Sequence, residues 1–217
     1  MRIGTWNLAG RWTPEHLGFI QGLRCDVLLL TEVRGDVAVP GMQCHATTEH
    51  MAEDRWWAAV LAPELMPLPD PHGASASALV DDLKVCSTVL PWRASGGDAP
   101  WKGGDTGHRA ANAVARIVES RPEVWGGDWN TSLEGRDWVG TRRGRAAVVD
   151  ATRELGLAVH TSAAPHRDTD QRAIDHVAVP EEWLLTRVDH VVAAVEGRYL
   201  SDHDAYVVET DPATVRA

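Results

Sequence analysis

The sequence predicts an α/β or α+β fold in which β-sheets are covered by helices. Strand patterns outnumber helical patterns and helices intervene between several strands, so the chain fits neither strict βαβ alternation nor an all-β sandwich. The chain has 217 residues, of which 44% are hydrophobic, and no composition break divides it. This length is sufficient for one well-buried core. We therefore expect a single domain that spans residues 1–217.

The N-terminal half is expected to contain one helix and several strands. An apolar strand ends at Asn7, and a second one ends at Glu32. Between them, Thr13 and Pro14 are typical of an N-cap and a first helical position, and apolar residues then recur at helical spacing. Prolines within residues 63–71 indicate turns. Further strands are expected at residues 42–47, 55–62 and 78–90.

The second half alternates between loop, helix and strand patterns. Residues 95–105 form a glycine-rich loop, and an alanine-rich helix follows at about 107–120. This helix leads into a strand that ends at Asp128. A third helix is expected over 144–156, because Gly156 is typical of a helix C-terminus. The remaining strands are expected at residues 173–179, 188–195 and 204–209.

Charge and cysteine content narrow the class of protein. Thirty-one acidic residues against 21 basic ones give a formal net charge of −10. This balance disfavours a broad surface that binds nucleic-acid phosphates, although it is compatible with a local basic patch.

Cys25, Cys44 and Cys86 are widely spaced, so neither a disulfide framework nor a thiolate zinc site is indicated. We expect all three to be buried apolar thiols.

The sequence indicates no targeting or membrane segment. The N-terminus enters a strand pattern at once, without a charged and then apolar leader, and no apolar run approaches the roughly 18 residues of a membrane span. We therefore expect a protein of the reducing cytoplasm that has no membrane partner. A monomer is favoured.

Five short apolar segments each end in a carboxylate, a carboxamide or a histidine. An ionised carboxylate among apolar neighbours is costly unless it is paired, hydrogen-bonded or bound to a cation. Several carboxylates that converge at strand ends therefore suggest a divalent metal. The polar residues at the five ends are Asn7, Glu32, Asp128 with Asn130, Asp175 with His176, and Asp202 with His203.

The order of these motifs resembles that of the endonuclease/exonuclease/phosphatase superfamily, which includes DNase-type nucleases, AP endonucleases, sphingomyelinases and inositol polyphosphate phosphatases. The resemblance extends over residues 3–208, and it implies a four-layer sandwich of two packed mixed, mainly antiparallel β-sheets flanked by helices. The motifs are Thr-Trp-Asn at 5–7, Thr-Glu at 31–32, Gly-Asp-Trp-Asn at 127–130, Ile-Asp-His at 174–176 and Ser-Asp-His at 201–203.

The resemblance implies a site for Mg²⁺ or Mn²⁺. Glu32 matches the central metal ligand of the family, and Asp202 matches a second acidic contact to the metal or its water. Asn7 is expected beside the metal, where its carboxamide would hold a metal-bound water or a phosphate oxygen. A hard cation needs oxygen donors and keeps several waters, so one or two protein carboxylates are sufficient.

The same resemblance implies four catalytic residues. Asp128 matches the aspartate that orients and deprotonates the attacking water. Asn130, expected on the same strand face, would hydrogen-bond the phosphate. The alternative interpretation of this motif is an Asx-type turn after the strand. Asp175 matches the carboxylate that orients His203, whose imidazole would stabilise charge on the phosphoryl oxygens.

One strand end departs from the family pattern. Val89 lies where the family usually carries a histidine or tyrosine that contacts phosphate, and valine cannot form that hydrogen bond. Arg93 is the favoured replacement, because a guanidinium matches phosphate geometry. Trp92 or the pair His108 and Arg109 could supply the contact instead, or catalysis is weakened.

Two further groups of residues are candidates for substrate binding. The first consists of tryptophans expected in loops at the active edge, which would either stack on bases or a sugar or cover the core; they are Trp92, Trp101 and Trp138. The second is the one dense basic stretch, which is either a phosphate clamp or a solvated flank of a helix; it contains Arg136, Arg142, Arg143 and Arg145.

The leading hypothesis is a Mg²⁺- or Mn²⁺-dependent phosphodiesterase, a nuclease or nucleotide phosphodiesterase, in which water activated by Asp128 attacks phosphorus in line. Its partner would be a phosphate-ester substrate such as a nucleic acid or a nucleotide. A phosphomonoesterase acting on a small phosphorylated metabolite is the alternative within this reaction class. An inactive or weakly active binding or accessory protein on the same fold is the alternative of another class, motivated by Val89.

Overall fold

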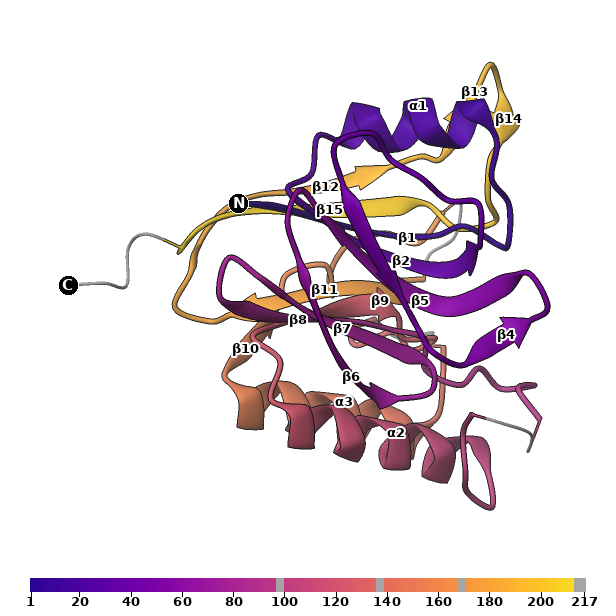
Figure 1. Ribbon diagram of the computed structural model, residues 1–217. Coiled ribbons are helices and arrows are strands. Elements are labelled where there is room, and N and C mark those ends of the chain that lie inside the picture. Colours follow the sequence, from indigo (N-terminus) through magenta and orange to yellow (C-terminus); the bar gives the residue numbers. More distant parts are fainter. Residues whose placement is uncertain (97–99, 136–138, 168–170, 213–217) are drawn as a thin grey trace.

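Figure 1 shows the protein as four layers, with two β-sheets packed face to face and helices on both outer faces. The computed structural model describes residues 1–96, 100–135, 139–167 and 171–212. Helix α1 covers one sheet, and α2 and α3 lie side by side on the other (Figure 1). In the described part of the chain, no helix combines the length and apolar character needed to cross a membrane. The helices are α1 (Pro14–Leu23), α2 (Thr106–Ser120) and α3 (Arg142–Leu155).

The first sheet, beneath α1, has seven strands and carries both chain-terminal strands, β1 and β15, as neighbours. The pair β1–β2 is parallel, and the other pairs in this sheet are antiparallel. The order across the sheet is β12 (Leu184–Val191), β15 (Ala205–Asp211), β1 (Arg2–Asn7), β2 (Val27–Arg34), β5 (Arg55–Ala62) and β3 (Gln43–Ala46), with β4 (His50–Ala52) also paired to β5.

The second sheet, beneath α2 and α3, has six strands, of which only the described pair β8–β9 is parallel. Its order is β10 (Leu157–Val159), β11 (Asp175–Pro180), β9 (Val124–Asp128), β8 (Leu83–Thr88), β7 (Ser75–Val80) and β6 (Met66–His72). A small hairpin pairs β13 (Ala194–Val195) with β14 (Arg198–Tyr199). The predicted sandwich of two mixed, mainly antiparallel sheets flanked by helices is therefore confirmed.

Side-chain alternation along the strands divides the core into three clusters. On β2, Leu29 packs between the two sheets, whereas Leu28 and Leu30 pack in the cluster that includes Ile20 of α1. The central cluster includes Ile3, Leu29, Val60, Val85, Val124 and Val177. The cluster of the second sheet with α2 and α3 is rich in tryptophan and includes Trp57, Trp101, Trp125, Trp129 and Val148.

The helices follow their predicted start and stop signals closely. Helix α1 begins at Pro14, and α2 covers the predicted range 107–120. Helix α3 ends before Gly156, whose φ of 66° is left-handed. It begins two residues earlier than predicted, because the hydroxyl of Thr141 caps it by accepting a hydrogen bond of 3.0 Å from the backbone N–H of Gly144.

Several sequence predictions about the fold are wrong. The strand expected at 188–195 is β12, which begins at Leu184 and ends at Val191. Residues 78–90 form the hairpin of β7 and β8, because Asp81 and Asp82 adopt left-handed φ angles of 48° and 65° and reverse the chain. The proline-rich residues 63–71, predicted as turns, contain most of β6, an edge strand whose prolines need no partner for a missing N–H. Cys44 is exposed on the edge strand β3 rather than buried.

The strand that leads to Asp128 packs very closely against the end of β8. Gly127 has a φ of 119°, and a Cβ atom here would lie 2.2 Å from the carbonyl oxygen of Thr88. Glycine alone combines this backbone conformation with so close an approach. Gly127 therefore determines how the chain reaches Asp128.

We expect Gly127→Ala to lower the free energy of unfolding by about 2 kcal/mol or more, because the strained φ and the backbone clash act together. Urea unfolding measures the change. The matched control is Gly22→Ala on α1, where no heavy atom lies within 4 Å of the added Cβ. That control should stabilise the protein by roughly 0.5–1 kcal/mol. Equal effects of the two substitutions would contradict this account of Gly127.

Candidate active site

The two sheets bring five of the predicted polar residues to one edge of the sandwich. On the first sheet, Asn7 at the end of β1 lies opposite Thr31, the residue before Glu32. On the second sheet, Asp128 at the end of β9 lies directly opposite Asp175 at the start of β11. His203 precedes β15, which runs antiparallel to β1. The site is therefore assembled from strand ends that are far apart in the sequence.

The carboxamide of Asn7 joins two carboxylates across the sheets. Its Nδ2 donates to Asp128 Oδ2 at 3.0 Å and to Glu32 Oε1 at 3.2 Å, and its Oδ1 accepts from the backbone N–H of Ala9 at 2.8 Å. Asn7 is fully buried. Its two amide hydrogens are thus used within the protein, and the predicted contact of Asn7 to a metal-bound water or a phosphate oxygen stays a prediction.

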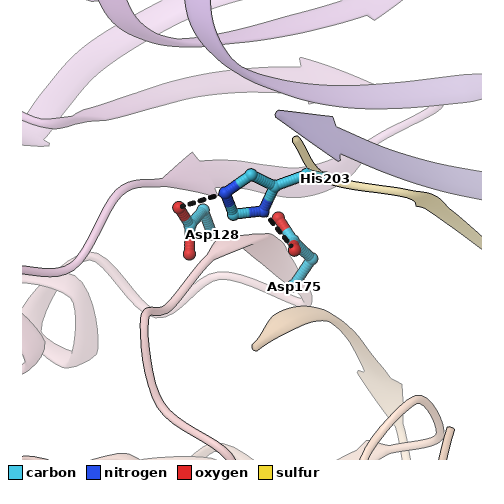
Figure 2. A group of neighbouring side chains, drawn as sticks. All are labelled: Asp128, Asp175 and His203. Carbon is cyan, nitrogen blue, oxygen red and sulfur yellow. Dashed lines mark hydrogen bonds and ion pairs between the residues drawn. The ribbon is translucent and has the colours of Figure 1, made fainter. Parts of the chain in front are cut away.

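His203 lies between two aspartates, as Figure 2 shows. Its Nδ1 is 2.8 Å from Asp175 Oδ2, and its Nε2 is 4.0 Å from Asp128 Oδ2. Asp128 and Asp175 are almost completely buried, and the His203 side chain is 15% exposed. The bond to Asp175 fixes the orientation of the ring and directs Nε2 toward Asp128.

Burial and mutual charge shift the acid–base properties of this group. Burial, reinforced by the negative charge of Asp175, raises the pKa of Asp128 to about 7. Burial opposes the charged form of His203, but Asp175 and then Asp128 outweigh it and raise the pKa of His203 to about 10. At neutral pH the imidazole is therefore a cation, and Asp128 is close to its midpoint of ionisation.

Two of the polar residues have left-handed backbones that non-glycine residues rarely adopt. Glu32 has a φ of 50°, and its carbonyl accepts a hydrogen bond of 3.0 Å from the N–H of Gly10. Asn130 has a φ of 49°. Such conformations cost of order 1–3 kcal/mol each and persist only where the surroundings impose them. Their presence at this edge is typical of a functional site.

The structure corrects the expected position of Asn130. Strand β9 ends at Asp128, so Asn130 is not on the strand face. Its backbone N–H donates to Asp128 Oδ1 at 2.9 Å, which is the Asx-type turn considered as the alternative. Its Nδ2 donates to the carbonyl of Leu90 at 2.9 Å, and one amide hydrogen remains for another acceptor.

Asp202 lies beside His203 in the chain, but it is exposed. Its Oδ1 lies 3.4 Å from the hydroxyl oxygen of Ser201, and its charge adds a minor contribution to the raised pKa of His203. None of the contacts in the described part of the chain joins Asp202 to Glu32. The predicted metal contact of Asp202 therefore stays a prediction.

The charge of the cluster fits a divalent cation. With Asp128 ionised, the carboxylates of Glu32, Asp128 and Asp175 exceed the single charge of His203, and within the described residues no lysine or arginine forms an ion pair with them. Asp175 Oδ1 is also buried without a hydrogen-bond partner among those residues. Carboxylate oxygens are the donors that Mg²⁺ and Mn²⁺ prefer. The residues present therefore fit the predicted type of metal.

Two sets of donors could hold such an ion. Ligand-type atoms of Asp128, Asp175 and His203 all lie within 4.8 Å of one another. A ligating imidazole must be neutral, however, whereas Asp175 and Asp128 raise the pKa of His203 and favour its protonated form in the metal-free protein. The half-buried Glu32, held to Asp128 through Asn7, offers oxygen donors without this conflict.

The residues proposed to replace the missing phosphate contact lie outside this cluster. Val89 is buried in the tryptophan-rich core, 1% exposed. Arg93 is exposed, and its carbonyl accepts a hydrogen bond from Thr106. Trp92 is half-buried, with its ring 5.5 Å from that of Trp101. In the described part of the chain, no contact joins these side chains to Asp128.

Trp101 is 2% exposed, so of the two roles considered for it the structure supports covering the core. It packs edge-on against Trp57, with ring centroids 4.7 Å apart, and so belongs to the core. A large apolar ring in a glycine-rich loop could not be assigned to the core from local pattern alone. Trp138 and Arg136 lie outside the described residues.

The basic stretch lies at the beginning of α3, close to Asn130. A Cβ atom on Gly140 would lie 3.1 Å from the carbonyl oxygen of Asn130, and α3 begins two residues later at Arg142. Arg142 and Arg143 are exposed. Arg143 also contacts His108 in the first turn of α2. These arginines are therefore near the site along the chain, without a described contact to its carboxylates.

Sequence reasoning missed Ser201 as a structural part of the site. Its hydroxyl donates to the carbonyl of Asn7 at 2.7 Å and accepts from the backbone N–H of His203 at 3.1 Å. His16, to which no role was assigned, contacts the carbonyl of Leu200 at 3.1 Å. The position of Ser201 within the Ser-Asp-His motif could have indicated its structural role. No sequence feature indicates the contact that His16 makes.

Comparison with solved structures identifies the fold. A 3′ phosphatase from Neisseria, NExo, bound to a product DNA hairpin, is 20% identical, with 97% of this chain and 99% of that chain covered and a TM-score of 0.68. An AP endonuclease from Archaeoglobus fulgidus is 14% identical, with the same coverage and a TM-score of 0.71. The human Nocturnin catalytic domain with a bound sulfate is 13% identical, and the TM-score is 0.64. The match covers 97% of this chain and 93% of the Nocturnin chain.

The first two are described as a 3′ phosphatase and an AP endonuclease, and the similarity extends over nearly the whole of each chain, so this protein shares the fold of these structures. No protein-family model matches the chain, and no curated protein matches its sequence. Identities of this size establish the architecture, and the chemistry has to be argued from the site itself.

We expect the imidazole of His203 to stay protonated up to about pH 10 in the metal-free protein, because Asp175 and Asp128 stabilise the cation. Asp175→Asn removes one of these charges and should lower the pKa of His203 toward its ordinary value. The pH dependence of the His203 ring signals in NMR spectra measures both values. Titration near pH 6.5 in the unsubstituted protein would contradict the cation assigned here.

Proposed function

We propose that this protein is a divalent-metal-dependent phosphodiester hydrolase that acts on nucleic acid. The observation that carries the proposal is the arrangement of Asp128, His203 and Asp175 beside the carboxylate of Glu32, at the strand ends of this fold. The solved structures with the same fold include a 3′ phosphatase with product DNA and an AP endonuclease, which supports the choice of substrate class.

Asp128 has the properties required of a general base. Its pKa of about 7 lies near the operating pH of most enzymes, where a base is partly ionised and still able to accept a proton. The backbone N–H of Asn130 and the amide of Asn7 hold one oxygen each. The carboxylate is therefore fixed in orientation while each oxygen keeps a further acceptor site for water.

His203 and Asn130 would stabilise the charge that develops on the phosphate. The cationic imidazole, held by Asp175, offers an N–H at Nε2 on the side of Asp128. The free amide hydrogen of Asn130 offers a second donor. Donors that are oriented before the reaction stabilise a transition state strongly in a poorly hydrated site.

Glu32, with Asp128 as its neighbour through Asn7, would hold the metal. When bound there, a Mg²⁺ or Mn²⁺ ion would withdraw negative charge from the phosphate and the leaving oxygen. The amide of Asn7 keeps the two like-charged carboxylates at a fixed spacing. These two hydrogen bonds to the carboxylates explain why a buried carboxamide lies at the end of β1.

The alternative of an inactive binding protein receives less support from the site. A site without catalytic work has no stability reason to keep three carboxylates together, since like charges in a buried position destabilise the fold. Removal of a terminal 3′ phosphate is the second candidate reaction, because one protein of the same fold is a 3′ phosphatase. Both reactions use the same in-line attack of water on phosphorus.

We expect hydrolysis that requires Mg²⁺ or Mn²⁺ and stops with EDTA. Abasic or linear DNA, 3′-phosphorylated DNA, bis-p-nitrophenyl phosphate and inositol phosphates form the substrate panel. Asp128→Asn and His203→Ala should each lower kcat by roughly 10²- to 10⁴-fold, because they remove the base and the charge-stabilising donor. Asp150→Asn, which changes an exposed carboxylate on α3, is the control. Unchanged turnover in both site variants would sink the proposal.

Arg142 and Arg143 are proposed to contact phosphates of the nucleic-acid backbone that flank the reacting one. Arg142→Gln and Arg143→Gln should raise KM for DNA several-fold and reduce the slope of log KM against log salt by about 1 each. Hydrolysis of bis-p-nitrophenyl phosphate should not change. Arg153→Gln, on the same helix and paired with Asp150, is the matched control. An equal effect on both substrates would contradict a role in DNA binding.

A further inference from the structure

A second buried charge cluster lies next to His203, and the proposed reaction does not use it. The Asp204 side chain is 1% exposed and that of Arg167 is 13% exposed. Arg167 Nε donates to Asp204 Oδ1 at 2.9 Å, and its Nη2 contacts the same oxygen. Asp204 also accepts from the N–H of Ala193 at 3.0 Å and from His190 Nε2 at 2.8 Å. The carboxylate is thus saturated with donors.

Arg167 connects this cluster to the backbone that carries His203. Its Nη1 donates to the carbonyl of Ser201 at 2.8 Å, and its guanidinium lies 4.1 Å from the ring centroid of Tyr199. The hydroxyl of Ser201 in turn bonds the N–H of His203 and the carbonyl of Asn7. Arg167 is therefore connected to both His203 and Asn7 through a single intervening residue, Ser201.

Arg167 itself belongs to the segment that leads into β11. Two described parts of this segment lie side by side, since the N–H of Ala173 donates to the carbonyl of Ala164 at 3.0 Å. Asp175 follows two residues later at the start of β11. Arg167 thus links the chain just before Asp175 to the loop that holds His203.

We infer that Arg167, through Asp204 and the carbonyl of Ser201, is a positioning residue that holds His203 against Asp175. The 2.8 Å bond between His203 and Asp175 joins the two sheets, so it depends on how their loops are fixed to each other. A guanidinium that contacts one carboxylate through two nitrogens can fix two loops rigidly to each other. The inference rests on the proposed function, in which His203 stabilises the phosphate.

Other contacts to the same loop do not replace this connection. Trp6 Nε1 donates to the carbonyl of His203 at 3.1 Å, and His16 contacts the carbonyl of Leu200. Both residues belong to the first sheet and to its helix α1. They hold the loop to its own sheet. A further hydrogen bond, from the hydroxyl of Tyr206 to the carbonyl of Pro165 at 2.9 Å, links the segment before Asp175 to β15 rather than to the loop that carries His203.

The test measures kcat and KM of the full chain with Mg²⁺ and bis-p-nitrophenyl phosphate. Arg167→Gln should lower kcat by roughly 10- to 100-fold, the effect of a small misplacement of a catalytic group, with little change in KM. Arg167→Lys, which keeps the charge but not the two-nitrogen grip, should recover part of the loss. Arg153→Gln is the matched surface control and should match the unsubstituted protein. A rise in KM at constant kcat would overturn the inference.

A double variant separates positioning from a direct role. If Arg167 acts through His203, Arg167→Gln should have no further effect on kcat in a His203→Ala background. An equal fold-loss in both backgrounds would mean that Arg167 acts on the substrate or on the fold as a whole, and the inference would be wrong. Circular dichroism of each variant shows whether it is folded, and Arg167→Lys carries the same comparison if Arg167→Gln does not fold.

A measurement without turnover keeps this inference separate from the proposed function. The proton shared by His203 Nδ1 and Asp175 should give a downfield NMR signal in the unsubstituted protein, which Asp175→Asn removes and so assigns. Arg167→Gln should broaden or abolish that signal, and Arg153→Gln should leave it unchanged. A signal that persists unaltered in folded Arg167→Gln overturns the positioning role, even if no phosphodiesterase activity is found.

Discussion

The structure depends on keeping carboxylates of like charge together where the two sheets meet. Asp128 and Asp175 face each other across β9 and β11, and the raised pKa of Asp128 reflects their burial and repulsion. Two polar groups make this arrangement tolerable: the cation of His203 lies between the aspartates, and the amide of Asn7 spans Asp128 and Glu32. Each comes from the first sheet and acts on the second. The site is thus also part of the junction between the sheets.

Backbone strain accumulates at the same edge. Glu32 and Asn130 have left-handed φ angles, and Gly127 approaches Thr88 too closely for any side chain. The regular strands on either side, whose inner faces form the central apolar cluster, hold these conformations in place. Backbone strain that orients a few polar groups is typical of a functional site, and each of these three residues is either a proposed site residue or, in the case of Gly127, adjacent to one.

Local signals made the helices and the strand ends predictable. Pro14 and Gly156 act within one helical turn, so the sequence alone indicates where α1 begins and where α3 ends, whereas the cap of Thr141 was missed and the start of α3 was predicted two residues late. The hairpin at Asp81 and Asp82 was missed because it lacks the usual glycine. The edge strand β6 and the buried Trp101 depend on partners far along the chain, which no local pattern encodes. Within the site, motif order predicted which residues gather, whereas the sequence left open whether Asn130 lies on the strand face or in an Asx turn.

The reaction class is easier to infer than the substrate for a physical reason. The proposed chemistry uses buried groups, and burial makes each contact strong and each orientation unique: His203 has one arrangement that satisfies Asp175, and Arg167 has one that satisfies Asp204 and Ser201. The residues proposed for substrate recognition, such as Arg93, Arg142 and Arg143, are exposed instead, so burial does not fix their side chains. On a chain of net charge −10, these arginines are also few, so a nucleic acid would be gripped locally near the reacting phosphate rather than along an extended surface.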